Sequence, residues 1–190
     1  VEGGRHPGLA LRSEEVVPMS IELGTETRCV IISGPNAGGK TVAMKTLGLV
    51  AMLTQCGFHP PADRVVLTPC TLYSDIGDRQ SVENDLSTFS AHMGRLRDIL
   101  AIVERGDIVL LDELGTGTDP DEGAAIAAAI LDRLLQAGAL VMATMNHSAL
   151  KIFAYHRDGV DNAGMEFGTG TREPTYRLML GVPGNSYAFE

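Results

Sequence analysis

The chain has 190 residues, 44% of them hydrophobic, with a formal net charge of −9 and a pI near 5.0. This composition predicts one globular domain with its own core, and no apolar run approaches the ~20 residues that a membrane-spanning helix needs. The acidic balance argues against a mainly DNA-contacting surface, because phosphate binding needs clustered Lys and Arg. Three cysteines without C-x-x-C spacing are typical of free thiols in a reducing cytosol.

Strands and helices alternate in the predicted chain. Apolar runs predict strands at residues 16–21, 28–33, 65–67, 72–73, 107–111 and 140–143, and helical periodicity predicts helices at 41–55, 87–103 and 148–155 and one ending near 137. Residues 160–167 and 176–182 are expected to pair antiparallel at the sheet edge. This order predicts an α/β fold with a mostly parallel sheet. We expect residues 1–190 to be one domain cut from a longer protein, since the chain begins at Val1 and not at Met.

The strongest signal is a glycine-rich run between a predicted strand and a predicted helix, which matches G-x-x-x-x-G-K-[ST]. Its residues are Gly34, Pro35, Asn36, Ala37, Gly38, Gly39, Lys40 and Thr41, and the helix continues through Val42. Glycines allow backbone N–H groups to turn toward an anion, and the helix N-terminus adds partial positive charge. Lys40 is expected to reach the β- and γ-phosphates, and Thr41 to ligate Mg²⁺. The chain is therefore predicted to bind a nucleoside triphosphate.

Asp112 and Glu113 end an apolar strand about 70 residues beyond this loop. Asp112 is expected to hold Mg²⁺ through water, opposite Thr41. Glu113 is expected to orient or deprotonate the attacking water. The alternative is a pair of solvated acids at a strand end. At Ser87, periodicity alone favours an N-cap of the helix that follows.

Three segments together resemble the ATPase domain of the MutS family, the ABC-class ATPase of DNA mismatch repair. They are GPNAGGKT at 34–41, DLSTFSAHM at 85–93 and LDELGTGTDPDEG at 111–123. The TDPDEG run and YRLMLGVPG at 176–184 are similar to the type-two bacterial branch, which carries an Smr domain. The resemblance spans the chain and implies a P-loop NTPase of the ABC class. It also implies a homodimer, in which each ATP with its Mg²⁺ lies between one subunit's P-loop and the other's signature loop.

The resemblance also implies roles for individual residues. Ser87 matches the signature serine, which contacts the γ-phosphate of the partner subunit's ATP. Residues 117–119 match the loop that crosses the dimer interface, and Gln80 lies in the loop that senses Mg²⁺ and the γ-phosphate. Val17 and Tyr176 fall where the family contacts adenine.

One position departs from the family. Members have Thr-His-Tyr after a central strand, and the His bonds the γ-phosphate. An alignment of residues 143–151 without gaps places Asn146 there and His147 one position later. An Asn amide donates a hydrogen bond but carries no charge. Either His147 takes the role through a local backbone shift, or hydrolysis is slow, since losing one transition-state donor costs ~10²-fold or more.

Our leading hypothesis is a cytoplasmic, ATP-hydrolysing dimerisation domain whose closure moves nucleic-acid-gripping domains elsewhere in a longer protein. For that protein, the resemblance implies DNA clamping, an Smr nuclease domain, suppression of recombination at branched DNA, and rescue of stalled ribosomes. A second hypothesis is a nucleotide-gated clamp that dimerises with little or no hydrolysis. A third is another ABC-class ATPase, such as a transporter motor, although the chain lacks the Leu-Ser-Gly-Gly-Gln signature.

Overall fold

The computed structural model describes residues 1–12, 15–77, 85–145, 149–168 and 173–184. The strands are β1 (Cys29–Ser33), β2 (Leu72–Asp75), β3 (Ile108–Leu111), β4 (Leu140–Met145), β5 (Val160–Phe167) and β6 (Pro174–Leu180). The helices are α1 (Pro7–Ala10), α2 (Lys40–Gln55), α3 (Asp85–Ile102), α4 (Pro120–Ala137) and α5 (Ala149–Tyr155), with a short 3₁₀ helix at Asn36–Gly38.

The strands form one sheet in the order β2-β3-β4-β1-β5-β6. All neighbouring strands run parallel except β5 and β6, which pair antiparallel at one edge. The predicted α/β fold with a mostly parallel sheet and an antiparallel edge is thereby confirmed. The carboxyl ends of β1, β3 and β4 lie side by side at one end of the sheet, where parallel α/β sheets bind ligands.

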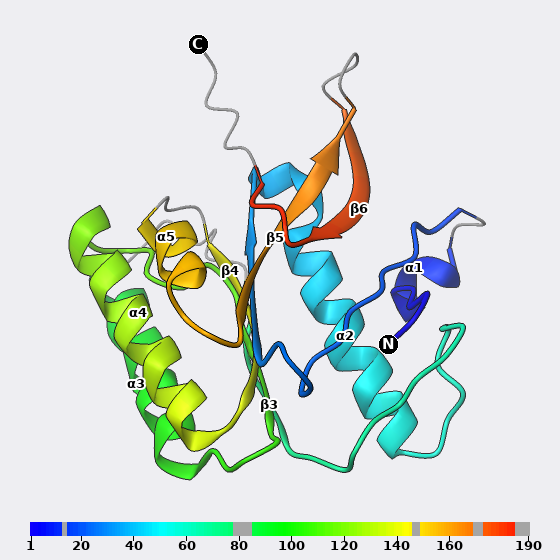
Figure 1. Ribbon diagram of the computed structural model, residues 1–190, viewed down its shortest axis with the longest axis horizontal. Coiled ribbons are helices and arrows are strands. Elements are labelled where there is room, and N and C mark those ends of the chain that lie inside the picture. Colours follow the sequence, from blue (N-terminus) through cyan, green and yellow to red (C-terminus); the bar gives the residue numbers. More distant parts are fainter. Residues whose placement is uncertain (13–14, 78–84, 146–148, 169–172, 185–190) are drawn as a thin grey trace.

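Helices cover both faces of the sheet (Figure 1): α2 packs on one face, and α3, α4 and α5 pack on the other. Alternate residues of β3 therefore enter different cores. Val109 and Leu111 face α3 and α4, whereas Ile108 and Leu110 belong to the core under α2. Burial on both faces explains why the central strands are continuous apolar runs in the sequence.

Two predicted strands are wrong. In residues 16–21, Met19 makes an isolated antiparallel bridge with Gly4, and Ile21 exchanges hydrogen bonds with the backbone of Val1. In the described part of the chain the segment thus bonds to the N-terminal residues and joins no strand of the sheet. Burial of Met19 and Ile21 against the α2 core also holds the segment. Residues 65–67 pair with no strand in the described part of the chain, and Val66 is 73% exposed.

The predicted N-cap role of Ser87 is also wrong, because α3 begins at Asp85 and Ser87 lies in its first turn. An acidic residue at a helix N-terminus is favoured by the helix dipole. Strand β6 begins two residues earlier than predicted, at Pro174.

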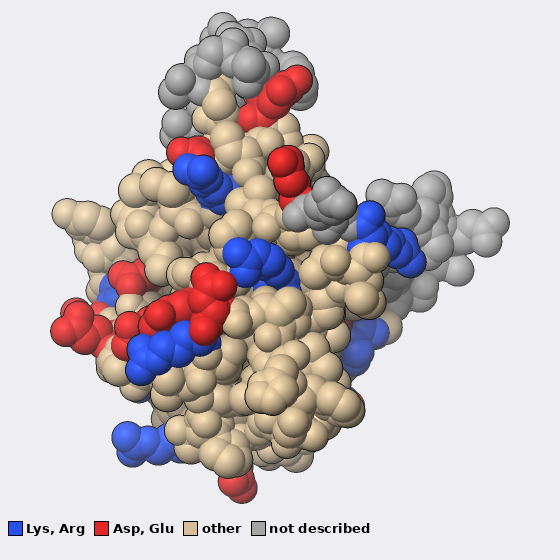
Figure 2. All heavy atoms as spheres, turned by 90° about the vertical axis from the view of Figure 1, so that its right-hand side faces the viewer, with Lys and Arg blue, Asp and Glu red and all other residues tan. Residues whose placement is uncertain are grey.

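Two further observations concern the helices and the charges on the surface. Among the described helices, none combines the length and apolar character needed to cross a membrane. On the face shown in Figure 2, Lys and Arg side chains are scattered among Asp and Glu side chains and do not gather into a basic stripe in its described part.

Candidate nucleotide-binding site

The glycine-rich loop connects the end of β1 to the start of α2. Gly39 has φ +94°, a left-handed conformation that glycine adopts without strain, and α2 begins at the next residue. A Cβ added at Gly39 would lie 3.2 Å from Cδ1 of Tyr176, so the loop also packs closely against β6. The chain thereby presents the N-terminus of a 16-residue helix beside the loop, as an anion site requires.

Lys40 lies inside this turn, only 3% exposed, and its Nζ donates to the Gly34 carbonyl. Burial lowers the pKa of Lys40, while the negative charges of Glu113 and Asp112 act in the opposite direction. The ammonium is therefore close to the two predicted acids, in a site with little competing water.

Asp112, directly after β3, is the centre of a hydrogen-bond network. The Thr41 hydroxyl donates to Asp112 Oδ2 at 2.8 Å, and the buried Thr144 hydroxyl of β4 donates to Oδ1. Thr144 Oγ1 also accepts the backbone N–H of Glu113 at 2.9 Å. The structure thus brings together Thr41 and Asp112, which are 71 positions apart in the sequence, as predicted.

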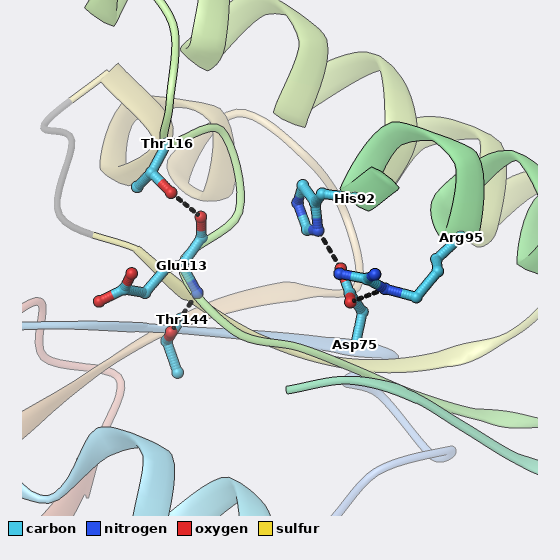
Figure 3. Close-up of polar contacts among 6 residues, drawn as sticks. All are labelled: Asp75, His92, Arg95, Glu113, Thr116 and Thr144. Atoms are coloured by element: carbon cyan, nitrogen blue, oxygen red, sulfur yellow. Dashed lines mark hydrogen bonds and ion pairs between the residues drawn. The ribbon is translucent and has the colours of Figure 1, made fainter. Parts of the chain in front are cut away.

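Glu113 has a backbone conformation that is rare for a residue with a side chain, φ +50°. Hydrogen bonds hold its backbone on both sides (Figure 3): the N–H donates to Thr144, and the carbonyl accepts from the Thr116 hydroxyl at 2.9 Å. In the figure its carboxylate points away from both contacts. These two hydrogen bonds fix the Glu113 backbone in a strained conformation, and strained geometry of this kind is common at functional sites.

The loop after Glu113 is packed tightly against α4. A Cβ added at Gly123 would lie 2.0 Å from the Gly115 carbonyl oxygen. Only a glycine at position 123 permits this approach, and it sets the path of the loop that contains Thr116.

These residues fit a magnesium ion. Mg²⁺ is bound through one or two protein oxygens, with phosphate oxygens and water completing its shell. The Thr41 hydroxyl and the Asp112 carboxylate already converge at 2.8 Å. Among the described residues, no cluster of three or more His, Cys, Asp or Glu suited to a metal occurs.

A cavity of about 370 Å³ adjoins the loop and is lined mainly by apolar side chains. Its lining residues are His6, Leu9, Glu15, Val16, Val17, Met19, Gly39, Val42, Ala43, Thr46, Met165, Tyr176 and Leu178. Val17, Val42 and Tyr176, predicted to contact nucleotide, lie together in this wall although they come from distant segments. They are 36%, 41% and 54% exposed.

Gln80, Asn146 and His147 lie outside the described residues, and for Asn36 and Ser87 only the backbone is described. Their predicted roles remain predictions.

Sequence reasoning missed Thr144, which connects Asp112 to Glu113. Its signal was a hydroxyl residue in a strand that is otherwise apolar, since a polar group buried between parallel strands needs partners. It also missed Asp75, at the end of β2, which binds His92 and Arg95 of α3.

Comparison with known proteins agrees with this geometry. Residues 30–188 match the family model of MutS domain V. The chain is 48% identical to endonuclease MutS2 of Halothermothrix orenii over 192 residues, and 50% identical to endonuclease MutS2 of Halalkalibacterium halodurans over 191 residues. Each match covers 100% of this chain and 24% of the relative. Endonuclease MutS2 of Brevibacillus brevis is 48% identical over 187 residues, covering 97% of this chain and 24% of the relative.

The chain thus spans about a quarter of the length of these curated relatives. The family match covers the P-loop, both acids at the end of β3, and the sheet that places them together. The chain belongs to the MutS domain V family.

Proposed function

We propose that this chain binds ATP with Mg²⁺ and hydrolyses it to ADP and phosphate. The observation that carries the proposal is the contact between the Thr41 hydroxyl and the Asp112 carboxylate, 2.8 Å apart at the start of a P-loop helix. This contact lies beside the proposed phosphate-binding turn and the buried Lys40, and it supplies two oxygens that suit Mg²⁺. Membership of the MutS domain V family supports the same activity.

The adjacent cavity is the proposed base site. Apolar walls suit a flat heterocycle, and Tyr176 offers an aromatic ring at the side nearest the loop. Val17, which precedes β1, and Val42, in the first turn of α2, would also pack against the base.

In the proposed reaction, Lys40 and the N-terminus of α2 bind the phosphates, and Thr41 and Asp112 hold the magnesium ion. The ion, when bound, neutralises charge on the phosphate oxygens. Glu113 orients the attacking water or accepts its proton. The hydrogen bonds of its backbone with Thr144 and Thr116 would hold its carboxylate in position for this role.

We further propose that two copies pair, so that each site is completed by the partner. By resemblance, Ser87 in the first turn of α3 contacts the γ-phosphate held by the other copy, and residues 117–119 cross the interface. A helix N-terminus with a hydroxyl stabilises negative charge without a cation.

Coupling to nucleic acid is proposed for the longer proteins of which this domain is a part. The relatives are named endonucleases, and we attribute that activity, together with contacts to branched DNA or the ribosome, to parts of those proteins outside the aligned quarter. The net charge of −9 and the mixed charges in Figure 2 support this division.

A second candidate function is a nucleotide-gated clamp that pairs on binding ATP but barely hydrolyses it. The observation that favours it is Asn146, at the position where the family has a histidine.

The test is steady-state ATP hydrolysis over a range of protein concentrations, for the wild-type chain, Glu113→Gln and Asn146→His. Specific activity that rises with concentration and is lost in Glu113→Gln supports composite hydrolytic sites. Unchanged turnover in Glu113→Gln would refute the assignment of Glu113. ATP binding without turnover in the wild type, restored by Asn146→His, supports the clamp.

A further inference from the structure

A buried ionic cluster links α3 to the end of strand β2. The Asp75 carboxylate binds Nδ1 of His92 and, at 2.6 Å, Nε of Arg95, both from α3 (Figure 3). Asp75 is 6% exposed and His92 is 2% exposed, whereas the Arg95 side chain is 57% exposed. The Asp75–His92 contact is therefore the one that water screens least.

The main chain of Asp75 faces the proposed catalytic acids. Its carbonyl accepts the backbone N–H of Asp112 at 3.0 Å, where β2 and β3 end side by side. Through its carboxylate and its carbonyl, Asp75 thus joins α3 directly to the residue that the proposed function assigns to magnesium.

Apolar side chains of α3 also hold the helix against the sheet. Leu96 and Ile99 pack against the core, and apolar packing is not directional. A hydrogen bond between buried groups is restricted in both distance and angle. His92 lies five residues after Ser87, roughly 7.5 Å along the helix axis at 1.5 Å per residue. A shift at His92 therefore moves the first turn of α3 with it.

The same end of α3 touches the loop after Glu113. A Cβ added at Gly117 would lie 3.5 Å from the Phe89 ring, so the two segments that the resemblance places at a dimer interface are neighbours within one chain.

We propose that the Asp75–His92 pair positions the N-terminal turn of α3 relative to Asp112, and so sets the part of the site that this chain supplies to its partner copy. The inference rests on the proposed function, in which two copies complete each other's sites. His92 is a positioning residue that acts through the helix.

The first test compares three replacements of His92 by turnover. His92→Phe keeps the ring volume but removes the donor to Asp75, and we expect turnover to fall ~10- to 100-fold, the loss typical of a misplaced catalytic group. In His92→Asn the amide nitrogen takes the place of Nδ1, and most activity should return. In His92→Gln it takes the place of Nε2, which is buried and has no partner among the described residues. Rescue by Gln and not by Asn would overturn the proposal.

The second test separates the two chains of a pair. Differently tagged chains are co-expressed and purified through both tags. With His92→Phe and Glu113→Gln on opposite chains, the one intact Glu113 is completed by a wild-type α3, and we expect that site to keep its turnover. With both substitutions on one chain opposite a wild-type chain, the site with the intact Glu113 receives the altered helix, and turnover should be lost.

The reverse result would show that His92 acts on its own chain's site, and equal losses in both pairings would show a general loss of structure. Either outcome overturns the inference. Failure of the proposed function is distinguishable, because it appears without any His92 variant: wild-type turnover would not rise with protein concentration, or Glu113→Gln would leave it unchanged.

Discussion

Thr144→Val should damage this protein more than its small change in shape suggests. The Thr144 side chain is completely buried, donates to Asp112 and accepts from the Glu113 N–H at 2.9 Å. Valine fills the same volume but leaves both groups without that partner. Each unsatisfied buried polar group costs ~1–3 kcal/mol, so we expect ~2–6 kcal/mol of lost unfolding free energy.

Thr144→Ser is the matched control. It keeps the hydroxyl and loses one buried methyl group, at a cost of ~1 kcal/mol. Urea unfolding without nucleotide measures both variants. A slope of ~1–3 kcal/mol/M implies that the midpoint of Thr144→Val falls by ~1 M or more, and that of Thr144→Ser by much less. ATP turnover should fall ~10-fold or more in Thr144→Val, because Glu113 loses the bond that fixes its backbone. If valine is no more destabilising than serine, the two hydrogen bonds do not contribute as argued.

Three further predictions follow from burial and charge. Gly123→Ala forces a Cβ against a loop carbonyl and should lower the unfolding free energy by ~1–3 kcal/mol. The control is Gly94→Ala, at a helix position with no atom within 4 Å of the added Cβ, which should raise the unfolding free energy by ~0.5–1 kcal/mol. Urea unfolding measures both variants, and equal effects would contradict the packing argument. Burial raises the pKa of Cys29 to about 12, so at neutral pH maleimide should label the exposed Cys56 in the native chain and reach Cys29 only after unfolding, as mass spectrometry of the labelled peptides will show. Burial alone would raise the pKa of Asp75, but its hydrogen bonds from α3 outweigh this effect and hold the pKa below its ordinary value of 3.8. The ionised carboxylate therefore stabilises the fold above pH 3.8, and this contribution is lost as the pH falls through the folded pKa. Urea unfolding from about pH 5 to about pH 3 should show that the unfolding free energy falls less steeply in Asp75→Asn than in the wild type.

The features that could be predicted from the sequence are those encoded by contiguous residues. The P-loop follows from glycines next to Lys40 and Thr41, and β3 follows from an apolar run that ends in Asp112 and Glu113. In these stretches the backbone preference of each residue and its burial agree, so local pattern was sufficient.

The two wrong strand predictions concern segments whose residue pattern is typical of a strand but which pair with no strand of the sheet. Residues 16–21 alternate as a strand would, but in the structure they bond to Val1 and Gly4 and form no ladder with the sheet, because a local pattern does not specify which segment becomes the neighbour. Residues 65–67 likewise include the β-branched Val65 and Val66 but have no paired strand in the described chain.

The sequence by itself determined the glycine-rich P-loop, the two acids at the end of an apolar strand and the α/β class of the fold. Each of these depends on residues that are neighbours along the chain. Only the tertiary structure decided that Thr144 joins Asp112 to Glu113, that Val17 and Tyr176 share one cavity, and that Asp75 connects α3 to β3. Those contacts join residues from separate elements, and their distances depend on how the helices pack on the sheet, which local preferences do not specify.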